Sequence, residues 1–216
     1  MLKLSNTLRN IRNISGYFFG KQFEEAKWGY TYQQYRRKYT ISPTFYFAGP
    51  GILLLGDGKM IFQGNSTIGR YSTVHASSNS RVEIGKNCAI AYFVSLIASS
   101  NIADQDFSKT NIWKRDSVLS KDKTIQIGDD CWIGSHVFIN PGVTIGNNAV
   151  VGANSVVTKN IPSHSISVGA PARVIRFKSY LDEQVMLELA KNNWSSLSLK
   201  LKKQLKQQYK IRVIPP

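Results

Sequence analysis

Residues 127–146 read IGDDCWIGSHVFINPGVTIG, and the same pattern continues to residue 157. Every sixth residue of this stretch is an isoleucine or a valine, and a glycine directly follows most of them. These aliphatic residues are Ile127, Ile133, Ile139, Ile145, Val151 and Val157. A helix repeats every 3.6 residues and a strand every two, so neither has this period. A six-residue repeat is typical of a hexapeptide parallel β-helix, in which each unit makes one short strand and one sharp turn.

A second position of the repeat supports this interpretation. The residues two places before the aliphatic ones are Ile125, Cys131, Val137, Val143, Ala149 and Ser155. From position 131 onward they are small or β-branched. Because residues i and i−2 of a strand face the same side, both sets are predicted to point into the solenoid.

The same rhythm occurs earlier in the chain with one interruption. It runs through Phe62, Ile68 and Val74, slips by four residues, and resumes at Ile84, Ile90, Leu96 and Ile102. Residues 103–123 then break the pattern and carry charges of both signs. A long loop that leaves a rigid solenoid is more often functional than not.

These boundaries predict three parts of the chain. Residues 62–177 form an all-β core, a parallel β-helix with a protruding loop over 103–123. Residues 1–61 form an N-terminal extension, helical at first and then made of entry strands. Residues 178–216 form a basic helical C-terminal extension.

The C-terminal extension is predicted to contain helices over 180–190 and 194–209. In the second of these, Trp194, Leu197 and Leu201 share an apolar face, and lysines surround the rest. Such a helix suits a cap on the open end of the solenoid or a contact with a neighbouring subunit. The alternative is a basic amphipathic helix that lies on a membrane surface.

The net charge is +15, from 28 basic and 13 acidic residues in a chain of 216. The excess is concentrated at both ends, but no nucleic-acid-binding module is visible, so nucleic acid is not an expected partner. An anionic membrane surface, an acidic glycan or a phosphorylated cofactor suits the charge better. Two cysteines at inward positions predict buried thiols, with no disulfide framework and no metal site. With no signal peptide and no long apolar run, we expect a cytoplasmic protein, or one peripheral to the inner membrane.

Three segments together resemble the hexapeptide-repeat acyltransferases. They are the stretch 127–146 quoted above, VVGANSVVTKNIP at 150–162, and GAPARVIR at 169–176. The likeness is greatest to galactoside and maltose O-acetyltransferases and to the O-acetyltransferases of bacterial capsule and lipopolysaccharide loci. It is close over residues 124–177 and looser over 62–102.

The resemblance implies a left-handed parallel β-helix that assembles as a homotrimer. It implies acetyl-CoA as co-substrate, bound in the groove between neighbouring prisms, and a sugar hydroxyl that attacks the thioester. The family's cofactor contacts fall on Ser135, Ala153, Thr158, Lys159, Arg173 and Arg176. A small side chain at Ala153 lets a pantetheine arm approach the backbone, and the cations suit the phosphates of CoA.

The family's catalytic histidine falls here on Asn101, and residues 76–135 contain no histidine. An asparagine cannot take a proton from a hydroxyl near neutral pH. We therefore expect Asn101 to position the substrates, and Asp104 of the loop or His75 of a neighbouring subunit to act as the base.

Three further residues are expected near the acceptor sugar, namely Tyr71, Asn79 and Trp132. An exposed tryptophan on a trimeric solenoid equally suits a subunit interface, so both interpretations of Trp132 stay open. His136 suits a structural place or the edge of the cofactor site.

The expected function is O-acetylation of a sugar in a bacterial surface polysaccharide or its precursor. One alternative is a degenerate relative that serves as a scaffold or assembly subunit, because the catalytic histidine is missing. Another is N-acylation of an amino sugar, because a neutral amine depends less on a base.

Overall fold

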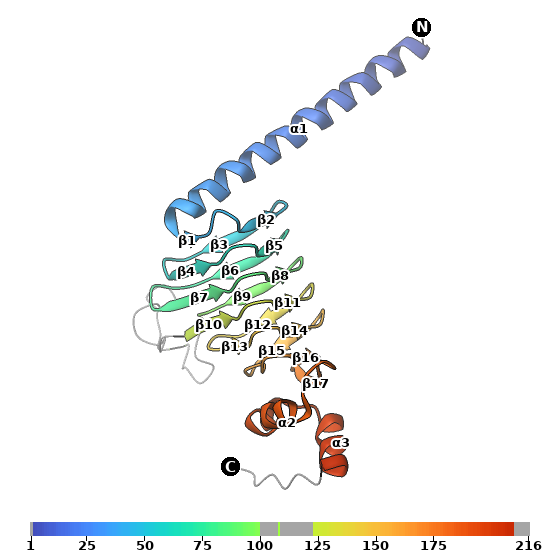
Figure 1. Cartoon of the computed structure of the whole chain (residues 1–216). Helices are drawn as coiled ribbons and strands as arrows, with labels where there is room; N and C mark the ends of the chain where they lie inside the picture. Colours follow the sequence, from blue (N-terminus) through green and yellow to red (C-terminus); the bar gives the residue numbers. More distant parts are fainter. Residues whose placement is uncertain (1, 100–107, 109–122, 210–216) are drawn as a thin grey trace. The chain divides into compact units, whose positions relative to one another are not determined.

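The computed structural model describes residues 2–99, 108 and 123–209, with side chains from residue 17 onward (Figure 1). The chain divides into two compact units, Met1–Lys38 and Tyr39–Pro216. Each is described by itself.

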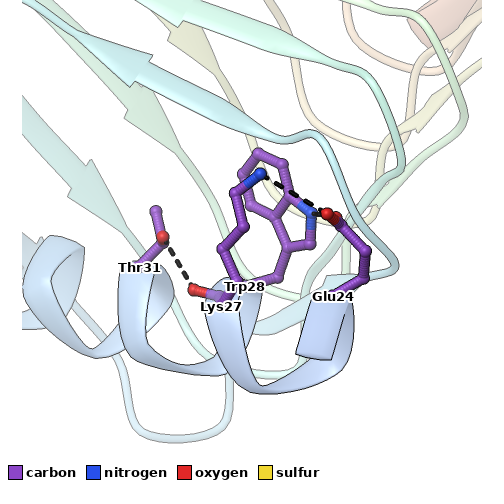
Figure 2. Close-up of polar contacts among 4 residues, drawn as sticks. All are labelled: Glu24, Lys27, Trp28 and Thr31. Atoms are coloured by element: carbon purple, nitrogen blue, oxygen red, sulfur yellow. Dashed lines mark hydrogen bonds and ion pairs between the residues drawn. The ribbon is translucent and has the colours of Figure 1, made fainter. Parts of the chain in front are cut away.

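The first unit is one long helix, α1 (Leu2–Lys38), as the sequence predicts. Near its middle, Glu24 accepts a hydrogen bond from Trp28 Nε1 at 3.0 Å and lies 3.5 Å from Lys27 Nζ (Figure 2). One turn on, Thr31 Oγ1 donates to the Lys27 carbonyl at 2.9 Å. The side-chain contacts of Glu24, three and four residues apart, stabilise an exposed helix slightly. Across the described ranges, no helix is both long and apolar enough to cross a membrane.

The second unit is built from three sheets, and the chain visits them in turn (Figure 1). The first sheet contains β1 (Thr40–Ile41), β4 (Lys59–Phe62), β7 (Ser80–Ile84), β10 (Lys123–Ile127) and β13 (Thr144–Ile145). The second contains β2 (Tyr46–Ala48), β5 (Thr67–Gly69), β8 (Ala89–Ile90), β11 (Trp132–Ile133), β14 (Val150–Val151), β16 (Ser165–Val168) and β17 (Arg173–Phe177). The third contains β3 (Leu53–Leu55), β6 (Thr73–His75), β9 (Ser95–Ile97), β12 (Phe138–Ile139) and β15 (Val156–Val157).

Each strand from β1 to β12 pairs in parallel with the strand three places later, and the strands from β1 to β15 make five coils of a left-handed parallel β-helix. This confirms the predicted fold. Its left-handed crossovers are an exception, because crossovers between parallel strands are usually right-handed. The last pair, β16 and β17, is antiparallel and ends the second sheet.

The core of the solenoid contains the two predicted sets of inward side chains. All six aliphatic residues from Ile127 to Val157 are buried, and so are their six partners two places earlier. Both cysteines are free and buried, as expected. Their thiols donate to backbone carbonyls of the next coil, Cys88 to Gly128 at 3.0 Å and Cys131 to Gly146 at 3.2 Å.

The coils begin earlier than the predicted boundary at residue 62. Ile41, Phe47 and Leu54 pair with Phe62, Ile68 and Val74, so the first coil starts at Thr40. The intervals from Ile41 to Phe47, to Leu54 and to Phe62 are six, seven and eight residues, which hides the six-residue repeat. Aromatic rings fill this end of the core, with Phe45 at 5.4 Å from Phe47 and 5.0 Å from Phe62 between ring centroids.

The first predicted C-terminal helix is present as α2 (Glu183–Asn192). The second, predicted over 194–209, is divided into the 3-10 turn η2 (Trp194–Ser196) and the helix α3 (Leu199–Tyr209), because the backbone is extended at Leu197. Leu201 and Leu205 of α3 are buried in one cluster with Val174 and Phe177 of β17. The apolar face of α3 therefore packs on the end of its own solenoid. The alternative in which this face lies on a membrane does not fit the structure, because the face is already covered.

Two neighbouring residues of β13 should contribute very differently to the free energy of unfolding. Ile145 is fully buried and Thr144 is exposed. We expect Ile145→Ala to lower the free energy of unfolding by about 2–5 kcal/mol, the usual cost of a cavity in a packed core. Thr144→Ala should change it by less than about 0.5 kcal/mol. Urea denaturation followed by circular dichroism measures both, and equal effects would contradict the inward assignment.

Candidate functional site

The corner between the second and third sheets has an unusual backbone. Tyr71, Phe93, His136 and Asn154 occupy this corner in successive coils, with φ values of 60°, 58°, 58° and 58°. Positive φ is unfavourable for bulky L-residues. The coil geometry maintains it here, for example through the hydrogen bond from His136 N to the Tyr92 carbonyl at 3.0 Å.

Three of these residues form a stacked column, which we call the aromatic ladder (Tyr71, Phe93 and His136). The ring centroids of Tyr71 and Phe93 are 5.2 Å apart at 20°, and those of Phe93 and His136 are 4.7 Å apart at 4°. Tyr71 is 52% exposed and Phe93 45%. The ladder is thus a continuous aromatic surface at one edge of the solenoid.

Sequence reasoning singled out Tyr71 and left His136 with a general structural role, but it missed Phe93. A signal was present, because each ladder residue stands three places after an inward aliphatic residue, at Ile68, Ile90 and Ile133.

Two predicted cofactor residues lie at the same corner. Ser135 and Ala153 precede His136 and Asn154, and Asn154 N donates to the Ser135 carbonyl at 2.9 Å. Ala153 is exposed and Ser135 is half-buried. The coils approach closely here, since a Cβ on Gly134 would lie 2.5 Å from Ala153 N. A ligand at this place would meet backbone and small side chains.

After β16, the chain crosses the end of this corner and continues into Arg173. Val156 N donates to the Gly169 carbonyl at 3.0 Å, and Ala172 N donates to the Val156 carbonyl at 2.8 Å. Arg173 begins β17 directly afterwards, half-buried, with Nη1 donating to the Ala172 carbonyl at 2.8 Å.

Thr158 and Lys159 follow β15 and are exposed. Two hydrogen bonds bring the start of α3 beside them and beside β17. Ser196 Oγ donates to the Asn160 carbonyl at 2.8 Å, and Ser198 N donates to the Val174 carbonyl at 2.8 Å.

Three basic side chains lie near enough where these elements join to act electrostatically on a fourth, Lys202, and we call the four the four-cation cluster (Lys159, Arg173, Lys202 and Lys206). Burial, and then the charges of Arg173, Lys159 and Lys206, hold the pKa of Lys202 below its ordinary value. The ammonium groups of Lys202 and Lys206 each lie 5.8 Å from the ring centroid of Trp194. Sequence reasoning identified Lys159 and Arg173, but it treated the two lysines of α3 as general surface charge.

Arg176, the remaining predicted cofactor contact, lies elsewhere. It lines an open cavity of about 350 Å³ between β17 and the two C-terminal helices. Gln204, Gln208 and Tyr209 line the same cavity, and the four-cation cluster does not. A CoA contact at Arg176 stays a prediction.

The expected catalytic and acceptor residues lie on different faces. His75 ends β6 on the third sheet, with Nδ1 3.3 Å from Ser99 Oγ. Trp132 points outward from the second sheet and is 59% exposed. Asn79 is exposed in the turn before β7. A single chain thus does not bring these three residues together, whereas Tyr71 lies at the corner that joins the two sheets.

Asn101 and Asp104 lie outside the described residues. Their predicted roles, like the role of His75 in a neighbouring subunit, stay predictions.

The repeat and the three parallel sheets define a hexapeptide-repeat protein. Residues 124–159 match the family model described as bacterial transferase hexapeptide (six repeats). No curated protein sequence matches the chain significantly.

Solved structures add three likenesses. The chain is similar to a maltose O-acetyltransferase from Clostridium difficile 630, with 30% identity, 63% of this chain and 71% of that chain covered, and a TM-score of 0.48. It is similar to AntD, an N-acyltransferase from Bacillus cereus in complex with dTDP and 3-hydroxybutyryl-CoA (22% identity, 72% and 86% covered, TM-score 0.48). It is also similar to the hexapeptide-repeat acetyltransferase VCA0836 of Vibrio cholerae, complexed with acetyl coenzyme A (25% identity, 68% and 75% covered, TM-score 0.44). Residues 124–159 of this chain thus have the hexapeptide repeats of the bacterial transferases.

Because of the aromatic ladder, alanine substitution at two glycines with positive φ should lower the free energy of unfolding by different amounts. Gly51 has φ 74°, and a Cβ there would lie 2.3 Å from Tyr71 Cδ1, whereas Gly142 has φ 78° and open space around it. We expect Gly142→Ala to cost about 1–2 kcal/mol of folding free energy from backbone strain alone. Gly51→Ala should cost at least about 1 kcal/mol more, because the stacked ring cannot yield freely.

Denaturation curves of both variants, with and without Tyr71→Ala, complete a double-mutant cycle. The excess cost of Gly51→Ala should vanish when Tyr71 is alanine. An excess that persists would show that the ring is not the obstacle.

Proposed function

We propose that the chain is an acetyl-CoA-dependent O-acetyltransferase that acts, as a homotrimer, on a sugar hydroxyl of a surface polysaccharide or its precursor. One observation carries the proposal. Ser135 and Ala153 lie on successive coils of one corner of the solenoid, and the chain crosses the end of this corner just before Arg173 of the four-cation cluster.

This order suits a long ligand with a neutral arm and a phosphorylated end. Ser135 and Ala153 lie on adjacent coils, about 4.8 Å apart as hydrogen-bonded strands are. The exposed Ala153 leaves room for a pantetheine arm, and Arg173 lies where the chain crosses the end of this corner. Charge-assisted hydrogen bonds from such cations are the usual means of binding phosphates.

In the proposed reaction, the acceptor hydroxyl oxygen attacks the thioester carbonyl carbon. The hydroxyl proton passes to a base, the carbon–sulfur bond breaks, and the base returns the proton to the departing CoA thiolate, which leaves as the thiol. Holding both reactants at the corner supplies much of the acceleration. We assign the base to His75, because Ser99 orients its ring. We assign it to the His75 of a neighbouring subunit, because Trp132 of the acceptor site lies on a different face from the His75 of the same chain.

The acceptor surface combines rings and positive charge. The aromatic ladder and Trp132 present exposed ring faces to a sugar. Arg70 lies 5.2 Å from the ring centroid of Tyr92 beside the ladder and adds a cation there. This combination suits a sugar that carries negative charge, or one joined to a nucleotide or lipid phosphate.

Thiol release from acetyl-CoA in the presence of a panel of sugars and amino sugars tests the activity. We expect His75→Gln to lower kcat by about 100-fold or more, the usual contribution of a general base, with CoA affinity unchanged. His164→Gln is the matched control, because His164 contacts Tyr180 at the corner between the first and second sheets. This substitution should leave kcat unchanged. If Asp104→Asn shows the large loss and His75→Gln does not, the base is the loop carboxylate.

The same assay separates the proposal from its alternatives. Asn101→His restores the family's residue and should raise thiol release. If neither protein turns over acetyl-CoA with any acceptor, the chain is a scaffold. If amino sugars alone react, it is an N-acyltransferase.

The two arginines of β17 should differ in CoA binding. Arg173 belongs to the four-cation cluster and Arg176 lines the separate cavity. We expect Arg173→Ala to weaken CoA binding by about 1–3 kcal/mol, the scale of a lost charge-assisted hydrogen bond, and Arg176→Ala to weaken it less. Calorimetry measures both affinities. Equal losses would contradict the separation of the two side chains.

A further inference from the structure

Lys202 and Lys206 lie one turn apart on α3, on the side near Lys159 and Arg173. The neighbouring residues Leu201 and Leu205 are buried against β17. Lys202 is half-buried, and both ammonium groups lie 5.8 Å from the ring centroid of Trp194. One face of this short helix thus packs on the core, and the next face carries two cations that lie over the Trp194 ring.

Two other elements bring further cations to the same place. Lys159 precedes Asn160, whose carbonyl accepts from Ser196 at 2.8 Å. Arg173 precedes Val174, whose carbonyl accepts from Ser198 N at 2.8 Å. The loop after β15, the start of β17 and α3 therefore converge within the same part of the molecule.

The cluster has a large unbalanced charge. Among the residues that the structure describes, none of its four members forms an ion pair with a carboxylate. Burial first, and then the neighbouring charges of Arg173, Lys159 and Lys206, hold the pKa of Lys202 below its ordinary value, so part of this effect is repulsion between like charges. Contact with Trp194 stabilises a cation but does not neutralise it. An anion with several charges would.

Other lysines of α3 show that this placement is particular to two of them. Lys206 is exposed, as Lys200 and Lys203 are, but its ammonium lies over the Trp194 ring and its charge acts on Lys202. Lys200 and Lys203 are not among the charges that act on Lys202. A helix that served solubility alone would not require Lys202 and Lys206 to face Arg173 and Lys159.

We propose that Lys202 and Lys206 bind the phosphates of the adenosine 3′,5′-bisphosphate part of CoA together with Lys159 and Arg173. The C-terminal helical cap is then a part of the cofactor-binding site. This inference rests on the proposed function, which places CoA at this corner. It adds two residues and one helix that the family resemblance does not supply.

Isothermal calorimetry with free adenosine 3′,5′-bisphosphate and with CoA tests the inference without any acyl transfer. We expect Lys202→Ala/Lys206→Ala to weaken both ligands by about tenfold or more, as the loss of charge-assisted hydrogen bonds does. The control Lys200→Ala/Lys203→Ala removes the same charge from the same helix and should change either affinity by less than about twofold. Lys202→Arg/Lys206→Arg keeps the charges and should retain most of the binding, which separates binding from folding.

The outcomes are distinguishable from those of the proposed function. If wild type binds CoA and the alanine pair binds it equally well, the role of α3 is wrong while the CoA site stands. If the two alanine pairs weaken binding equally, the effect is one of net charge and the inference also falls. If wild type binds neither ligand, the CoA site and the inference are both overturned.

Discussion

The structure depends on one constraint, namely that the chain turns a sharp corner after every short strand and still fills the interior. Each unit contributes one aliphatic residue and one smaller partner to the core, and parallel pairing places identical positions of successive coils above one another. The turns need a left-handed residue in nearly every unit. Since the coils stack in parallel, any outward residue at a given corner position becomes a member of a column.

Two corner columns show how the same geometry has different consequences. The corner between the first and second sheets is occupied by Asn65, Asn87, Asp130, Asn148 and His164. Asparagine and aspartate tolerate positive φ well, and Asn87 donates to Asp130 at 3.2 Å, so this column serves the fold. The next corner holds Tyr71 and Phe93, which tolerate positive φ poorly, together with His136 and Asn154. Aromatic residues retained in an unfavourable conformation on an exposed edge point to binding.

The sequence predicted the regular part of this molecule because a repeat exposes its own rule. Ile127 to Val157 could be assigned inward from spacing alone, and α1 and the C-terminal helices from their length and apolar spacing. The first coil could not, because its inward residues Ile41, Phe47 and Leu54 are unevenly spaced and large rings replace the aliphatic side chains. The stacking of Phe93 between Tyr71 and His136 depends on coils that are more than twenty residues apart, and spacing within one unit does not show it.

The C-terminal cap illustrates a further limit of reading a helix from its pattern. Lysines around an apolar stripe predict an amphipathic helix, but not which lysines meet other charges. That depends on the hydrogen bonds of Ser196 and Ser198, which fix α3 against the last loop and β17. The consequence is that one short helix has two duties on adjacent faces. Leu201 and Leu205 close the core, and the neighbouring lysines hold a charge that favours an anion. A ligand that binds the cations would therefore stabilise the cap as well, because it binds only when α3 is in place.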